Sequence, residues 1–171
     1  MASRILKALQ QVGTHAVGNL NSLKVKTVAN GALIEGADVD NFTLVELGFN
    51  TDGERVAKQL SAVDKKAYLV AAPETRYLGE AMADFYNAVG ERARIVILEE
   101  GYTRFDTSAF TGAPTNGKVA HFDPTSKKFL IHDGTHADYA TAKAKFLVVS
   151  NEDDMEYTIG QALVRLEVIE A

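Results

Sequence analysis

The sequence predicts a mainly β protein of the α+β class, an antiparallel-rich β-barrel or sandwich with one inserted helix. From residue 23 onward, about eight to ten short apolar or alternating segments are separated by turn-forming residues, a spacing typical of β sandwiches and barrels. In the same part of the chain, only the segment at about 74–89 has a helical period over several turns. The 171 residues are a suitable length for one core. We therefore expect an N-terminal arm or short helix at 1–22 and a single β-rich domain at 23–171.

The N-terminal segment carries a short apolar face. Ile5, Leu9 and Val12 share one side of a helix of about three turns, and a small polar stretch at 14–22 follows it. Helices of this length are marginal in water unless they pack against something, so the segment is either a core helix or an arm that orders on a partner. We expect the arm to bind the partner through apolar and basic side chains. These residues are Arg4, Ile5, Lys7, Leu9 and Val12.

The next part of the chain has the residue pattern of β-strands. Apolar residues alternate with lysines at 23–28, and the Asn30-Gly31 pair favours a tight hairpin turn. The expected strands in this part are 23–28, a return strand at 32–35 and a further strand at 42–47, while 54–60 is expected to be a covered loop.

A strand–helix–strand unit is predicted in the middle of the chain. The apolar runs at 67–72 and 93–98 are the expected strands, and Pro73 suits the boundary because proline is tolerated in the first turn of a helix. The helix at 74–89 is predicted from four residues that recur on one face. They are Leu78, Met82, Phe85 and Val89.

The C-terminal part is predicted to contain a hairpin and two final strands. With a turn at 124–127, Phe122 faces Phe129 and Ala120 faces Ile131, which gives the hairpin one apolar face. A surface loop is expected at 107–117, and the last strands at 146–149 and 163–168.

Composition excludes several function classes. The net charge of -5 has the wrong sign for a protein that neutralises phosphates, so we expect no nucleic-acid partner. No apolar run approaches the roughly 20 residues that a membrane helix needs, and the N-terminus lacks a signal-peptide pattern. Because the chain has no cysteine, thiol nucleophiles and thiolate metal sites are excluded.

Two histidines are the strongest candidates for chemistry. In the predicted hairpin, His121 and His132 lie diagonally on the outer face, with Asp123 and Asp133 nearby, and two histidines with a carboxylate can ligate a divalent metal. The spacing matches no metal-binding motif, so a half-exposed histidine pair is the favoured interpretation. No serine has the surroundings of a nucleophile elbow. We expect no catalytic, cofactor-binding or metal-binding residues, no cofactor and no enzymatic activity.

Several short strings resemble those of a known group of proteins. They are Val70-Ala-Ala-Pro-Glu74, the segment from Phe85 to Ile95, the hairpin from Gly117 to Pro124 and the closing segment from Leu163 to Ile169. In this order they resemble the head decoration, or capsid cement, proteins that tailed bacteriophages encode beside the major capsid protein. The resemblance implies a structural protein on the outside of the virion, made in the host cytoplasm. Its implied partners are the major capsid protein and further copies of itself.

Two other functions remain open from the residues. A small-ligand-binding β-barrel requires an apolar cavity of about 300 Å³ or more with a few polar groups aimed inward. A metal-dependent hydrolase that uses His121 and His132 requires a third ligand and an open coordination position.

Overall fold

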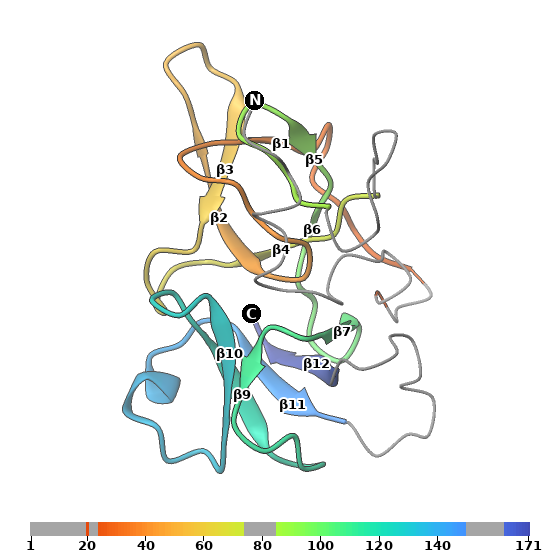
Figure 1. Ribbon diagram of the computed structural model, residues 1–171, viewed down its shortest axis with the longest axis vertical. Coiled ribbons are helices and arrows are strands. Elements are labelled where there is room, and N and C mark those ends of the chain that lie inside the picture. The colour runs from red at the N-terminus through yellow and green to blue at the C-terminus, as the bar shows by residue number, and fades with distance from the viewer. Residues whose placement is uncertain (1–19, 21–23, 74–84, 150–162) are drawn as a thin grey trace.

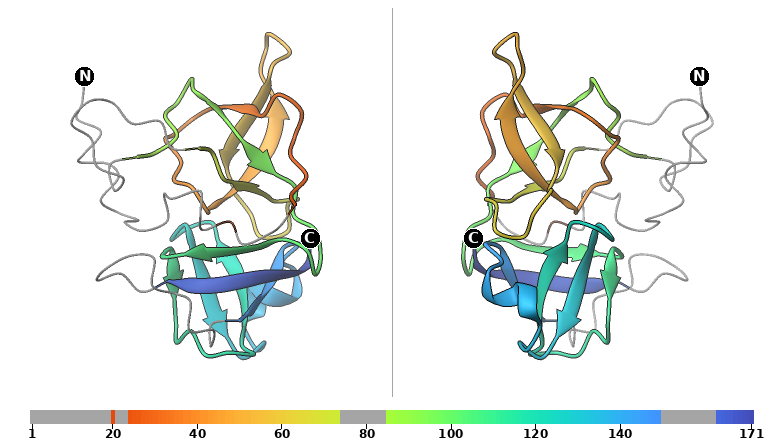
Figure 2. Two further views of the ribbon diagram at one scale, coloured as in Figure 1. Left: turned by 90° about the vertical axis from the view of Figure 1, so that its right-hand side faces the viewer. Right: turned by 90° about the vertical axis from the view of Figure 1, so that its left-hand side faces the viewer.

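The computed structural model describes residue 20 and residues 24–73, 85–149 and 163–171. In this part of the chain the strands form two six-stranded sheets, which lie one above the other in Figures 1 and 2. No helix here is long and apolar enough to cross a membrane. The strands are β1 (Ala32–Ile34), β2 (Leu44–Phe49), β3 (Arg55–Gln59), β4 (Tyr68–Val70), β5 (Arg92–Ala93), β6 (Ile95–Val96), β7 (Arg104–Thr107), β8 (Phe110–Thr111), β9 (Val119–Asp123), β10 (Lys128–His132), β11 (Lys145–Val148) and β12 (Val164–Glu170). A 3-10 helix spans Ala137–Ala140.

The first sheet curls until it nearly closes on itself. Its strand order is β5-β1-β3-β2-β4-β6, and the two end strands are separated in sequence by Arg94 alone. A bridge between Thr27 and Val96, and a hydrogen bond from the Val28 N–H to the Ile95 carbonyl, add further backbone to the β6 edge. The predicted mainly β class is therefore confirmed, and this sheet has the shape of a barrel.

Two expectations for this sheet are wrong. Asn30 and Gly31 do form a turn with positive φ angles, but β1 pairs with β3 and β5 rather than with 23–28. The expected covered loop at 54–60 contains β3, which forms an antiparallel hairpin with β2. Val56 and Ala57 are buried in that strand, and the Asn50 side chain accepts N–H bonds within the turn that precedes it.

The predicted helix at 74–89 is wrong over residues 85–89. Residues 74–84 lie outside the described residues, and 85–89 are not helical. Asn87 instead forms an antiparallel bridge with Val39, to which it is joined by backbone hydrogen bonds in both directions. Phe85 is buried as expected, but Val89 is 52% exposed in the turn that leads to Gly90. Tertiary pairing has therefore overridden the apolar period at this end of the segment.

The second sheet has the strand order β7-β12-β11-β9-β10-β8. The predicted hairpin is β9–β10, and its register confirms that Phe122 faces Phe129 and Ala120 faces Ile131. The expected loop at 107–117 contains the short strand β8, which pairs in parallel with β10. The last strands are β11 and β12, as expected, and they pair antiparallel.

A cluster of phenylalanine rings joins the two sheets. Phe42, which precedes β2, stacks on Phe105 of β7 with ring centroids 6.2 Å apart. Phe105 contacts Phe129 and Phe146, and Phe129 also contacts Phe122, all at centroid distances below 6 Å. Aromatic pairs at such distances contribute about 0.5–1.5 kcal/mol each beyond the area they bury. Both sheets therefore contribute to one apolar core.

The backbone around Phe42 is held in an unusual conformation. Its φ of +57° is rare for a bulky residue. The Phe42 N–H donates to the Val70 carbonyl at 2.7 Å, and the Thr107 hydroxyl donates to the Phe42 carbonyl at 3.4 Å. The buried Asn41 side chain donates to the Ala72 carbonyl and accepts from the Ala72 N–H. These bonds fix the turn that presents the Phe42 ring to the second sheet.

We expect Phe105→Ala to lower the free energy of unfolding by about 3–5 kcal/mol, because the ring lies at the centre of the shared core. Phe49→Ala is the matched control, since this ring is 69% exposed and its loss should change stability by less than about 0.5 kcal/mol. Urea unfolding followed by far-UV circular dichroism and tyrosine fluorescence should give coincident transitions. Two separated transitions, or a loss below about 1 kcal/mol, would contradict a shared core.

Candidate functional site

The predicted partner-binding residues of the arm lie outside the described residues. These are Arg4, Ile5, Lys7, Leu9 and Val12. The arm therefore stays a prediction, and the candidate sites below come from the described parts of the two sheets.

The two histidines of the β9–β10 hairpin lie on the face of the second sheet opposite the phenylalanine core. His121 pairs with Leu130 and His132 with Val119, as the predicted register requires. The His121 Nδ1 and the His132 Nε2 are 2.9 Å apart, which is a hydrogen bond. The expectation of a half-exposed pair is wrong for His121, which is 0% exposed, while His132 is partly exposed.

The loop after β10 explains this burial because it folds back over the two imidazoles. Asp133 accepts hydrogen bonds from Thr135 and starts the turn, and the 3-10 helix Ala137–Ala140 follows. The His136 ring then lies with its centroid 4.8 Å from that of His121, and the Tyr139 ring lies 4.9 Å from that of His132.

The loop supplies residues that sequence reasoning missed. One nitrogen each of His121 and His136 and one oxygen of Asp138 lie within 4.8 Å of one another, so these three residues are able to hold a metal ion. The expected carboxylates have other partners, because Asp123 caps the hairpin turn at Thr125 and Ser126, and Asp133 holds Thr135. The only sequence signal was a histidine and an aspartate two positions apart in a turn-rich segment.

The hydrogen bonds among these residues fix where the imidazole hydrogens lie. The Gly134 N–H donates to the His132 Nδ1 at 2.9 Å, so a neutral His132 carries its hydrogen on Nε2 and donates it to the His121 Nδ1. A neutral His121 must then carry its own hydrogen on Nε2. Among the described residues this buried nitrogen has no hydrogen-bond partner. A buried polar group without a partner costs about 1–3 kcal/mol.

The cluster also changes how the imidazoles titrate. Burial, assisted by the neighbouring His132 and His136, lowers the pKa of His121 to about 4, although Asp138 and Asp123 act in the opposite direction. Burial and the nearby His136 also lower the pKa of His132. Both rings are therefore neutral at pH 7, the form in which histidine binds metal ions.

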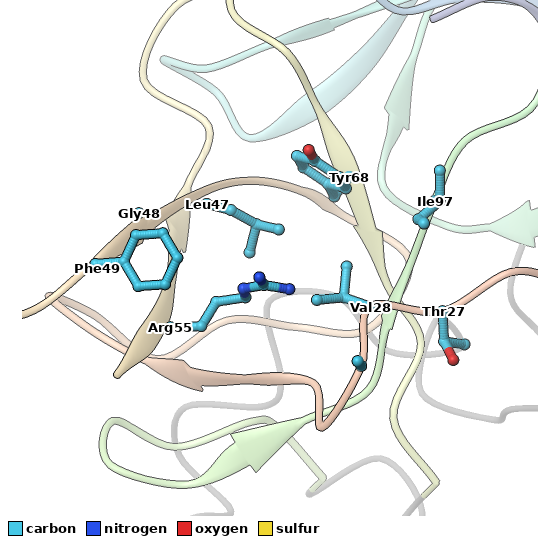
Figure 3. Close-up of a pocket in the computed structure, with 9 residues that line it drawn as sticks. Thr27, Val28, Leu47, Gly48, Phe49, Arg55, Tyr68 and Ile97 are labelled. Carbon is cyan, nitrogen blue, oxygen red and sulfur yellow. The ribbon is translucent and has the colours of Figure 1, made fainter. Parts of the chain in front are cut away.

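A second candidate site lies on the first sheet. An open groove of about 450 Å³ is lined by Leu47, Tyr68 and Ile97 together with the exposed Phe49. Figure 3 shows the Arg55 side chain extending between Phe49 and Val28, within this apolar surface. The Arg55 guanidinium carbon lies 5.6 Å from the centroid of the Phe49 ring. The groove thus combines apolar walls with one cation, which suits an apolar or aromatic group beside a negative charge.

We expect the contribution of His121 to the stability of the chelator-treated protein to rise with pH between about 4 and 6.5. Because the pKa of folded His121 lies below its ordinary value of 6.5, the unfolded chain binds more protons in this range. The contribution is complete above about pH 6.5, is lost as the pH falls towards 4, and is of the order of 1–2 kcal/mol after screening.

His121→Gln, which cannot titrate, isolates this effect. Burial raises the pKa of Asp40 to about 7, which gives the opposite slope over the whole of this range, but Asp40 is present in both proteins. The difference between the two pH profiles of unfolding free energy should therefore report His121. Parallel profiles would show that the His121 pKa is not lowered.

Comparison with known proteins identifies the origin of the chain. The family model described as "YonC prophage protein" matches residues 11–169. The SPbeta prophage-derived uncharacterized protein YonC of Bacillus subtilis (strain 168) is 63% identical over 178 aligned positions, which cover 100% of both chains. No solved structure matches the chain. The resemblance to phage proteins is thus confirmed as a phage origin. The chain belongs to the YonC prophage protein family.

Proposed function

We propose that this protein is a structural component of a phage particle that binds the outer surface of the capsid, where it decorates or stabilises the head. The observation that carries the proposal furthest is the exposed Phe49, beside Arg55 and an open apolar groove, on a protein of prophage origin. The proposed role needs no catalysis and no cofactor.

The position of Phe49 supports a contact with another protein. Phe49 ends β2, and in Figures 1 and 2 the β2–β3 hairpin extends away from the second sheet at the end of the molecule. Aromatic residues and arginine are enriched at the centres of protein interfaces, where they contribute most of the binding energy. A 69% exposed phenylalanine is costly to leave in water, and a partner surface would remove that cost.

The proposed binding depends on many copies. One ring and one guanidinium form a small contact, so a single copy should bind weakly. A capsid presents many equivalent sites, and association between neighbouring copies would add avidity without any new contact to the shell. The proposed partners are therefore the major capsid protein and other copies of this chain, and the proposed location is the exterior of the virion.

We expect Phe49→Ala to weaken association with assembled phage heads by about tenfold or more, because truncating a central aromatic residue at an interface costs roughly 1–2 kcal/mol or more. Tyr102→Ala is the matched control, since Tyr102 is also a strongly exposed aromatic residue but lies in the connection between the two sheets. Co-sedimentation of each purified variant with heads measures the effect. Equal losses for both variants, or none for Phe49→Ala, would contradict this contact.

The N-terminal arm gives a separate prediction. We expect deletion of residues 2–13 to leave the melting temperature nearly unchanged and to weaken head binding, because every copy loses the anchor formed by Ile5, Leu9 and Val12. The same co-sedimentation assay, with a thermal melt, measures both effects. Unfolding of the truncated protein would instead favour a core helix, and full retention of binding would contradict the anchor.

The presence of the protein in particles tests the proposal as a whole. Mass spectrometry of gradient-purified particles should find the protein in many copies, and limited protease treatment of intact particles should remove it before the capsid protein is cleaved. Its absence from purified particles would overturn the structural role.

The groove supports a second candidate function, the binding of a small ligand. Its volume of about 450 Å³ is sufficient for a small molecule, and Arg55 would pair with an anionic group. The groove is open to solvent, whereas most small-ligand sites enclose their ligand. An anionic aromatic dye such as 8-anilinonaphthalene-1-sulfonate distinguishes the candidates. Stoichiometric fluorescent binding that Arg55→Gln abolishes would favour ligand binding.

A further inference from the structure

We propose that His121, His136 and Asp138 bind a divalent transition-metal ion of the zinc class, and that His132 orients His121 as its hydrogen-bond partner. The site lies on the outer face of the second sheet, away from the Phe49 groove of the first sheet. It does not depend on the proposed capsid role, and either proposal can fail alone.

The first argument is the arrangement of ligand atoms. Two imidazole nitrogens and a carboxylate oxygen lie within 4.8 Å of one another, and this donor set is one that zinc and related ions use. Around zinc the ligand atoms lie roughly 3.3 Å apart, so the site must contract. His121 is fixed in β9, but His136 and Asp138 are exposed on the loop and are able to move inward. Water would complete the coordination.

The second argument is the unpartnered nitrogen. The His121 Nε2 is completely buried without a hydrogen-bond partner in the described structure, and His121 is one of the three residues whose ligand atoms converge. Because its Nδ1 is already bonded to His132, Nε2 is the nitrogen left for an ion. A metal ion at this position satisfies that atom with a bond stronger than any neutral hydrogen bond. A bound metal ion would explain two independent features, namely the unpartnered nitrogen of His121 and the convergence of the loop ligands.

The hydrogen bonds predict what must change when the ion binds. Coordination needs the lone pair of the His121 Nε2, so its hydrogen must move to Nδ1, where it is donated to the His132 Nε2. His132 then carries its hydrogen on Nδ1 and no longer accepts the Gly134 N–H. This exposed N–H donates to water instead. Each imidazole has one hydrogen before and after, so the exchange is balanced and releases no proton from this pair.

The ligand nitrogen of His136 follows from the same reasoning. Its Nδ1 accepts the Asp138 N–H at 3.3 Å, so a neutral His136 carries its hydrogen on Nε2 and has its lone pair on Nδ1. This nitrogen is also 3.9 Å from the Asp138 Oδ2. An ion between these two atoms would replace a long hydrogen bond and leave the Nε2 hydrogen in solvent. The expected ligand atoms are therefore the His121 Nε2, the His136 Nδ1 and an Asp138 oxygen.

The site would fasten the loop to the sheet. Without the ion, the segment 133–141 is held mainly by its own turn bonds and by ring contacts with the histidines. With the ion, two loop residues are bonded to a residue of β9. We therefore infer a structural ion, and we expect the melting temperature to rise when it binds, because the folded state alone presents the assembled site.

The experiment uses tag-free, full-length protein stripped with a chelator and titrated with Zn²⁺ in a calorimeter. We expect one ion per chain, and binding weakened by roughly a hundredfold in His136→Ala and in Asp138→Asn, since loss of even an outer-shell partner costs 10–100-fold. Both residues are exposed, so both variants should fold. Asp133→Asn is the matched control, because its exposed carboxylate on the same loop already binds Thr135.

A second measurement tests the geometry. Long-range ¹H–¹⁵N correlation spectra should show the hydrogen of His121 moving from Nε2 to Nδ1 when Zn²⁺ is added, and Co²⁺ should give the visible absorption of a low-coordinate site with nitrogen ligands. Failure to bind one ion per chain would overturn the proposal. So would unchanged binding in both His136→Ala and Asp138→Asn, or saturation with Zn²⁺ without any change at His121.

Discussion

The stacking of Phe42 on Phe105 is the contact on which the architecture depends. Phe42 lies just before β2 of the first sheet and Phe105 belongs to the second sheet, and through Phe129, Phe146 and Phe122 the contact extends across the second sheet. The left-handed backbone of Phe42 is tolerated because Asn41 clamps Ala72 on one side and Thr107 bonds the Phe42 carbonyl on the other. The inner faces of both sheets are thus occupied by packing, and the candidate sites lie on surfaces that this core does not use.

Sequence patterns correctly predicted the pairing of strands that are close together in the chain. The β9–β10 hairpin was predicted with its register because a short turn joins two segments whose apolar residues face each other, as Phe122 faces Phe129. The parallel pairing of β1 with β3, and the near closure of the first sheet at Arg94, depend on contacts between distant segments. No local signal reports such contacts. For the same reason Asn87, which bridges to Val39, was mistaken for the end of a helix.

In the histidine cluster too, the sequence predicted only the part that neighbouring residues determine. The hairpin register placed His121 and His132 on one face correctly, and the structure brings them into hydrogen-bond contact. The burial of His121, and the approach of His136 and Asp138, come from a loop whose path is set by its own turns and by a backbone bond from Lys143 to Val63, in the connection between β3 and β4. A sequence without a metal-binding motif gives no information about that path. His136 and Asp138 therefore could not be predicted as members of the cluster.

The strand order of the second sheet has a consequence for how the chain is made. In the described structure β7 has one strand neighbour, β12, and a buried ion pair joins Asp106 to Arg165, 59 residues later. A ribosome releases β7 long before β12 exists. During that interval β7 lacks the strand with which it pairs in the finished sheet. The first sheet can curl early, but the second sheet reaches its final form only when β12 is inserted between β7 and β11, so completion of the fold must follow the synthesis of β12.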